Sequence, residues 1–321
     1  MTSVSTLATW LSGYIPDIPT PFDEHGAVDL ATLATLCERQ IEAGVTAIVV
    51  SEISGEASTL TPTEQEAIVR AAVKVARGRV RIVAGAGSNS TSHAIELAQR
   101  AEAAGADAVL SVVPYYNKPM QAGIQAHFRA IAISTALPII LHDVPSRTMR
   151  ELSDDTLLRL ANSRHFIGLK DATGDLARLW RLRRRLPAGF RLLSGEDATA
   201  LPFIANGGDG CISIVSNIAP EMCQAVFSNC RLAQPQTARY LHERLLPLTT
   251  CLAKESPAAL KYALFLLGLM SPATRLPIVE LSDEAKAEVA RAIADIGDED
   301  IACAVERWPG PRLHEDTVTP S

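Results

Sequence analysis

Lys170 is the residue whose type and position best suit covalent chemistry. It is one of only six lysines in a chain with 24 arginines, and it directly follows the apolar run 166–169. Burial disfavours the charged ammonium, so we expect a lowered pKa and a neutral amine that can attack a ketone and form a Schiff base. The protonated imine would withdraw electrons and let the adjacent carbon lose a proton. Alternatively, Lys170 only pairs with a neighbouring acid.

Other polar side chains follow apolar runs elsewhere in the chain, where strands would end. When parallel strands close into a barrel, their carboxyl ends meet at one face, and the loops that follow them form the active site. We therefore expect Lys170 to share this face with four further segments: SEISGE (51–56), PYYN (114–117), HDVPSR (142–147) and SGED (194–197).

Eight short apolar runs recur along the chain. Continuous apolar runs, unlike alternating ones, indicate strands that are buried on both faces, as in a parallel sheet. The opening run is the weakest because it contains two prolines. The runs are YIPDIP (14–19), TAIVVS (46–51), VRIVAG (80–85), ADAVLSVV (106–113), LPIILHD (137–143), HFIGLK (165–170), FRLLSG (190–195) and DGCISIV (209–215).

The stretches between these runs have the pattern of helices. Apolar side chains recur at helical spacing over 29–43 and 91–104, and Thr91 or Ser92 is the expected cap of the second helix. The segments IEAGVTAIVV and AEAAGADAVL nearly repeat, and each should end its helix at a glycine, Gly44 or Gly105, in the left-handed conformation. This repeated junction indicates a fold made of copies of one βα unit.

Eight strands with helices between them predict an α/β fold, a (β/α)8 TIM barrel. A doubly wound open sheet is the alternative, but no G-x-G-x-x-G motif follows an early strand. We expect the barrel to span 1–230 and a C-terminal helical extension packed on it to span 231–300. A polar tail should cover 301–321.

The composition of the chain indicates which kinds of partner and which cellular compartment to expect. The 321 residues carry a net charge of −6, which argues against nucleic acid and anionic membranes as partners. No apolar run is long enough for a spanning helix, and the N-terminus lacks the features of a secretory signal, so we expect a cytoplasmic protein. The six cysteines form no C-x-x-C pair, which predicts free thiols and no metal site.

Five motifs give the chain a resemblance to a known family. It resembles the dihydrodipicolinate synthase / N-acetylneuraminate lyase family in SGEA (54–57), PYYNKP (114–119), VPSRT (144–148), GLKDATG (168–174) and LLSGED (192–197). The resemblance implies a barrel with a C-terminal helical extension, usually a homotetramer built as a dimer of dimers. It also implies that Lys170 forms a Schiff base with pyruvate or another 2-keto acid, without a cofactor or metal.

Several binding residues follow from the same resemblance. Ser54 and Gly55 match the motif whose hydroxyl and backbone N–H groups hold the pyruvate carboxylate. Gly195 and Ile212 match positions that line the pyruvate pocket. The alternative for Ser54 is a loop cap.

Two further residues would act on the second substrate or on a neighbouring subunit. Tyr116 matches the tyrosine that reaches into a neighbour's site and relays protons, and interface packing is the alternative. Arg147 matches the arginine that binds the carboxylate of the second substrate, a task that suits its planar fork. The alternative for Arg147 is a surface salt bridge.

The chain departs from the family pattern at four positions. His142 stands where the family has a tyrosine that donates and accepts protons, and histidine can also do acid–base work. Ile53 replaces a threonine of the proton relay, and Glu52 replaces a glycine. His93 stands where lysine-inhibited members tend to have a glutamate, so we expect weak or no inhibition by lysine.

Three functions remain open at this stage. The first is a lyase or aldolase that condenses pyruvate with an aldehyde, aspartate semialdehyde, in lysine biosynthesis; the motif containing Arg147 favours it. The second is a catabolic aldolase or dehydratase acting on a sugar acid or another 2-keto acid, which the altered relay at Ile53 and His142 favours. The third is a non-enzymatic paralogue that binds a keto acid, against which the lysine at 170 weighs.

Overall fold

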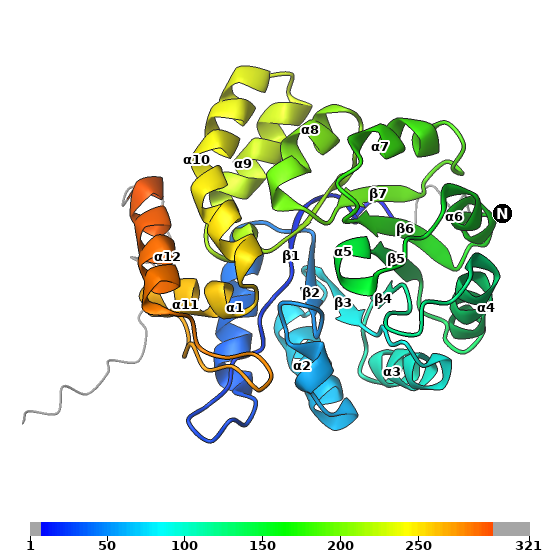
Figure 1. Ribbon diagram of the computed structural model, residues 1–321, viewed down its shortest axis with the longest axis horizontal. Helices are drawn as coiled ribbons and strands as arrows, with labels where there is room; N and C mark the ends of the chain where they lie inside the picture. The colour runs from blue at the N-terminus through cyan, green and yellow to red at the C-terminus, as the bar shows by residue number, and fades with distance from the viewer. Residues whose placement is uncertain (1–7, 298–321) are drawn as a thin grey trace, which may run out of the picture.

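The computed structural model describes residues 8–297 and shows a ring of parallel strands surrounded by helices (Figure 1). This arrangement confirms the TIM barrel and excludes the doubly wound alternative. The strands are β1 (Gly13–Pro16), β2 (Ala47–Val50), β3 (Arg81–Gly85), β4 (Ala108–Val112), β5 (Ile139–Asp143), β6 (Phe166–Asp171), β7 (Arg191–Ser194) and β8 (Gly210–Ser213).

The ring closes between the first two strands. Seven neighbouring pairs run from β2 through β8 to β1, all parallel. The last gap is bridged where the Ile18 amide donates to the Val49 carbonyl at 2.9 Å, beside a parallel bridge between Asp17 and Val49. Asp17 therefore lies at the carboxyl end of β1, on the closing seam of the barrel.

The helices follow the strands around the ring, and their bounds agree with the helical patterns of the sequence. In chain order the barrel helices are α1 (Leu30–Glu42), α2 (Pro62–Ala76), α3 (Thr91–Ala103), α4 (Gln121–Ala132), α5 (Pro145–Thr148), α6 (Asp154–Ala161), α7 (Leu176–Arg183), α8 (Ala200–Ala205) and α9 (Pro220–Arg231). Three short 3-10 turns are η2 (Ala57–Thr59), η3 (Asp197–Thr199) and η4 (Val215–Asn217).

Three more helices complete the described chain outside the ring of strands (Figure 1). They are α10 (Pro235–Lys254), α11 (Ala258–Leu266) and α12 (Asp283–Ile296). None of the helices within 8–297 is long and apolar enough to cross a membrane. The expected tail, 301–321, lies outside the described residues, as does Cys303; the five cysteines within them are free thiols.

Two apolar cores hold the barrel together. One lies inside the ring, where side chains from all eight strands meet; it consists of Ala8, Leu11, Ile15, Ala47, Val49, Val83, Ala108, Leu110, Ile140, Ile167, Leu193 and Ile212. The other lies between the sheet and the helices. Burial on both sides explains why the strands are continuous apolar runs.

The local signals at the helix ends were partly correct. Gly44 and Gly105 have φ of 80° and 89°, which confirms the left-handed ends of α1 and α3. The prediction that Thr91 or Ser92 caps α3 is wrong, because the cap is Ser90 and its side chain makes no capping hydrogen bond. Thr91 lies in the first turn, where its hydroxyl instead forms a hydrogen bond with His127 Nδ1 at 2.9 Å.

Candidate active site

Lys170 lies near the carboxyl end of β6, only 4% exposed, next to two carboxylates. Its Nζ is 3.3 Å from Glu52 Oε2 and 3.8 Å from Asp17 Oδ2. The strand register places His142 of β5 directly beside Lys170. Lys170 thus lies where residues from several strand ends meet.

Glu52, in the loop after β2, connects these groups. Its Oε1 is 2.9 Å from His142 Nδ1, and its Oε2 accepts a hydrogen bond from the Ile53 amide at 2.6 Å. Together with the contact to Lys170, one carboxylate therefore bridges an amine and an imidazole. We call Asp17, Glu52, His142 and Lys170 the buried cluster; the four side chains come from the ends of β1, β2, β5 and β6.

The expected lowering of the pKa of Lys170 is wrong. Burial does lower this pKa, but the negative charges of Glu52 and Asp17 outweigh burial and leave the pKa raised. The same ion pair holds the pKa of Glu52 well below its ordinary value against the effect of burial. The free chain therefore has the ion pair that the sequence left open as an alternative, and the amine must give up a proton before it can attack a carbonyl.

The pKa values of the other two members of the cluster are shifted in the direction that favours their uncharged forms. Burial and the charge of Lys170 lower the pKa of His142, although Glu52 opposes the shift. Burial and repulsion from Glu52 raise the pKa of Asp17 to about 7. Because the ionised Glu52 can only accept a hydrogen bond, His142 must carry its proton on Nδ1. Its buried Nε2, which has no hydrogen-bond partner, then keeps a free lone pair.

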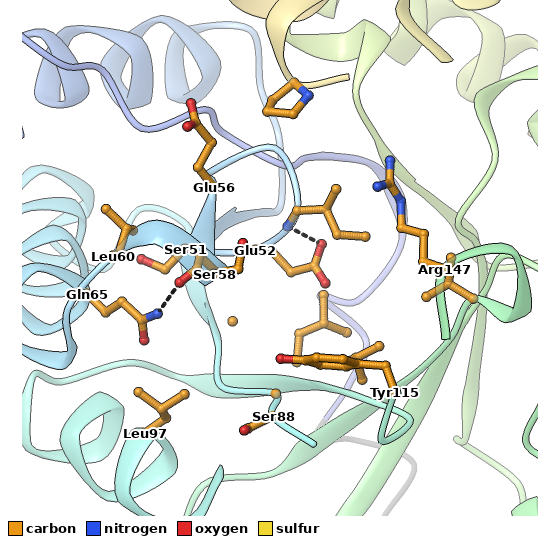
Figure 2. Close-up of a pocket in the computed structure, with 18 of the residues that line it drawn as sticks. Ser51, Glu52, Glu56, Ser58, Leu60, Gln65, Ser88, Leu97, Tyr115 and Arg147 are labelled. Atoms are coloured by element: carbon orange, nitrogen blue, oxygen red, sulfur yellow. Dashed lines mark hydrogen bonds between the residues drawn. The ribbon is translucent and has the colours of Figure 1, made fainter. Parts of the chain in front are cut away.

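A cavity of about 510 Å³ opens beside the buried cluster. Of the four cluster residues, Glu52 is the one that lines it, together with Ile53, Tyr115 and Arg147. Figure 2 shows the Glu52 carboxylate between its own loop and the side chains of Tyr115 and Arg147. A substrate in this cavity would meet Glu52 before Lys170.

The residues expected to bind the keto acid lie close to the cluster. Ser54 is fully buried; its amide is 3.4 Å from Asp17 Oδ2, and its hydroxyl has no hydrogen-bond partner within the described chain. A Cβ at Gly195 would lie 2.8 Å from Ala172 Cβ and 3.2 Å from Lys170 Cγ, so a larger residue would press on the end of β6 that carries the lysine. Gly55 lies in the same turn as Ser54, and Ile212 points into the barrel core.

Arg147 and Tyr116 occupy different environments. Arg147 is exposed on the short helix α5, which follows β5, and lines the cavity, where a guanidinium suits a carboxylate ligand. Tyr116 is 89% exposed, has a left-handed φ of 69°, and does not line the cavity. Within one chain it is thus separate from the buried cluster, whereas its neighbour Tyr115 lines the cavity.

Contacts with α11 and β3 hold the loop that carries Glu52 in place. Glu56 Oε1 pairs with Lys261 Nζ of α11 at 2.5 Å, and both side chains are fully buried. Gly85 of β3 permits the close approach of this loop, since a Cβ there would lie 2.0 Å from the Ser51 carbonyl oxygen. The C-terminal helices therefore help to set the position of Glu52.

Sequence reasoning missed the contribution of Asp17 and the central position of Glu52. Asp17 interrupts the apolar run YIPDIP, and a charged residue within such a run is a signal that could have drawn attention. Glu52 was noted only as a departure from a glycine. The sequence does not reveal which residues Asp17 and Glu52 contact, because these contacts form only when the barrel closes.

Comparisons with known proteins agree with this fold and site. Residues 10–296 match the model of the dihydrodipicolinate synthetase family. The chain is 46% identical over 286 residues to 4-hydroxy-tetrahydrodipicolinate synthase of Phenylobacterium zucineum, covering 89% of this chain and 97% of that protein. It is 47% identical over 285 residues to the synthase of the same name from Thiobacillus denitrificans, covering 87% and 95%.

Solved structures give the same result. Dihydrodipicolinate synthase from Aquifex aeolicus superposes with a TM-score of 0.85 at 37% identity, covering 88% of this chain and 97% of that one. The chloride-inhibited dihydrodipicolinate synthase from Acinetobacter baumannii, solved in complex with pyruvate, gives 0.86 at 40% identity, covering 89% and 99%. With its barrel, its buried lysine and these relatives, the chain belongs to the dihydrodipicolinate synthetase family.

Proposed function

We propose that this enzyme is a Schiff-base lyase that condenses pyruvate with aspartate semialdehyde, the reaction of 4-hydroxy-tetrahydrodipicolinate synthase. The observation that carries the proposal is the place of Lys170: a buried amine at the carboxyl ends of the strands, in contact with the Glu52 carboxylate. The names of the relatives support the choice of substrates. Lysine supplies the electrophilic imine itself, so the chemistry needs no cofactor or metal.

The surroundings of Lys170 support separate roles in binding. The unpartnered Ser54 hydroxyl and the backbone around Gly55 would hold the pyruvate carboxylate. Gly195 and Ile212 would leave room for the pyruvate carbons. Arg147 at the cavity edge would bind the carboxylate of the aldehyde substrate.

The exposed Tyr116 supports a homotetramer built as a dimer of dimers. A large aromatic side chain that is almost fully exposed on one chain is typical of an interface residue. In this assembly Tyr116 would enter the site of a neighbouring subunit. The cytoplasm is the compartment that fits a biosynthetic enzyme of this kind.

Trapping of the imine tests the proposed function. Wild type incubated with pyruvate and borohydride should gain the mass of one reduced adduct per chain, and Lys170→Ala should gain none. Lys118→Ala, which changes an exposed lysine, is the matched control and should gain the adduct. A coupled assay with aspartate semialdehyde should then show turnover; no adduct in wild type would refute the proposal.

A second candidate is an aldolase or dehydratase that acts on another 2-keto acid or sugar acid. Ile53, His142 and Glu52 favour it, since they change the groups that move protons around the imine. Adduct formation with pyruvate but no turnover with aspartate semialdehyde would support this second candidate over the first.

A further inference from the structure

Glu52 is placed to move protons between the amine, the substrate and the imidazole. We propose that Glu52 is a catalytic residue: it accepts the proton of Lys170, returns protons to the ketone oxygen of the substrate, and orients His142 as the base that removes the proton from the adjacent carbon. The inference rests on the proposed function, since it concerns the same imine.

The two carboxylate oxygens of Glu52 have different partners. Oε2 lies 3.3 Å from Lys170 Nζ, within reach for proton transfer, while Oε1 binds His142 Nδ1 at 2.9 Å. Glu52 is also the cluster residue that lines the cavity, so it can touch an entering substrate. These three contacts are what a group that transfers protons to substrate requires.

The contact with Glu52 favours the protonated form of His142, against the effects of burial and of the charge of Lys170. A carboxylate that accepts from Nδ1 fixes the tautomer and stabilises the imidazolium that forms when Nε2 takes a proton, as in a carboxylate–histidine pair of a hydrolase. His142 Nε2 is buried and has no hydrogen-bond partner among residues 8–297, so its lone pair is free within the described part of the chain. Ile53, next to Glu52 in the same loop, has no hydroxyl and cannot take part in this proton transfer.

The proton movements of imine formation balance through Glu52. Lys170 first gives one proton to Glu52, and the neutral amine then forms a bond to the ketone carbon while the carbonyl oxygen takes that proton. The nitrogen loses a second proton to Glu52, which passes it to the hydroxyl group. The carbon–oxygen bond breaks, water leaves, and the protonated imine remains with Glu52 ionised again. His142 Nε2 then removes a proton from the adjacent carbon, which leaves a neutral enamine and an imidazolium beside Glu52.

Other charged groups face the cluster and shape its response to pH. Asp17 lies 3.8 Å from Lys170 Nζ on the side of β1. Arg147 and Glu196 also interact with members of the cluster through their charges. At a pH where Asp17 is ionised, the cluster carries one excess negative charge, which disfavours an anionic keto acid. Binding of pyruvate should therefore weaken as the pH rises through neutrality.

Two variants separate the two tasks of Glu52. Glu52→Gln keeps the size of the side chain but cannot accept the proton, so the rate of borohydride trapping with saturating pyruvate should fall by about 100-fold. His142→Asn keeps a donor toward Glu52 but lacks the Nε2 base. It should form the imine within about threefold of the wild-type rate, while exchange of the pyruvate methyl protons with deuterium, followed by NMR, should fall about 100-fold.

Chemical rescue distinguishes catalysis from structure. Glu52→Ala leaves space beside the cavity. Added formate should raise the trapping rate of this variant at least tenfold, whereas added chloride should not change it. The thermal unfolding midpoint of each variant checks that it is folded. Two results would overturn this inference and leave the proposed function intact. The first is that Glu52→Gln traps pyruvate at the wild-type rate, and the second is that His142→Asn exchanges the methyl protons at the wild-type rate.

A competing role for Glu52 has the opposite signature. Glu52 Oε2 accepts a hydrogen bond from the Ile53 amide at 2.6 Å. This amide is next to the residues expected to hold the substrate carboxylate. If Glu52 only occupied that anion site, Glu52→Gly would trap pyruvate faster and at lower concentration than wild type, which would overturn the inference. Absence of any adduct in wild type would overturn the inference together with the proposed function.

Discussion

Replacing Asp17 by asparagine should change how stability depends on pH. Asp17 is buried, its Oδ1 has no hydrogen-bond partner, and its pKa is raised from 3.8 to about 7. A pKa that is higher in the folded than in the unfolded chain means that folding favours the protonated form. Its stabilising contribution is complete below about pH 4 and is lost as the pH rises through 7.

The size of the effect follows from this shift. Each pH unit between the two pKa values corresponds to about 1.4 kcal/mol, so raising the pH from 5 to 8 should cost wild type about 2.5 kcal/mol through Asp17 alone. Asparagine does not titrate, so the variant does not have this loss. The free energy of unfolding of Asp17→Asn minus that of wild type should therefore increase by about 2.5 kcal/mol over this range.

Urea titrations followed by tryptophan fluorescence at pH 5, 6, 7 and 8 measure this difference. The protomer concentration must be equal throughout, because assembly also affects apparent stability. Asp295→Asn is the control, since it makes the same replacement at an exposed residue of α12. Parallel stability curves for Asp17→Asn and wild type would refute the raised pKa of Asp17 and the electrostatic description of the cluster.

Three further perturbations test the support of the site. Lys261→Met removes the cation paired with the buried Glu56 carboxylate, which keeps its hydrogen bond from the Arg275 amide, and should lower the free energy of unfolding by about 3–5 kcal/mol. Adding Glu56→Gln should restore most of this loss in urea titrations; a double variant as unstable as the single one would contradict this. Gly195→Ala should slow imine trapping roughly 10- to 100-fold, because its Cβ would press on Ala172 and on the Lys170 stem; trapping at the wild-type rate would count against this close packing. Thr61→Ala removes the capping box of α2 and should cost about 1 kcal/mol; an unchanged urea midpoint would count against that cap.

The barrel could be predicted from the sequence because its signals are local and repeated. Each strand is a continuous apolar run, and each helix carries an apolar stripe, so the periodicity of a few residues reveals the element. The glycines at 44 and 105 mark helix ends because the left-handed conformation favours glycine. The cap of α3 was misplaced because Ser90, Thr91 and Ser92 are all suitable capping residues, and only the backbone conformation selects among them.

The placement of Lys170 at a strand end was likewise predictable, but the protonation state of its amine was not. Burial along an apolar strand suggests a neutral lysine, and that expectation uses only neighbours in sequence. Glu52 is 118 residues away in the chain and Lys170 meets it only when β2 and β6 take their places in the ring. At 3.3 Å its charge reverses the direction of the shift.

The sequence by itself determined which residue types stand at the ends of the strands, because strand order and strand length are encoded by local apolar patterns. Only the tertiary structure decided which of them touch: Glu52 between Lys170 and His142, with Asp17 on the closing seam. The physical reason is that electrostatic interaction depends on distance through space and on burial, and the closure of the barrel sets both.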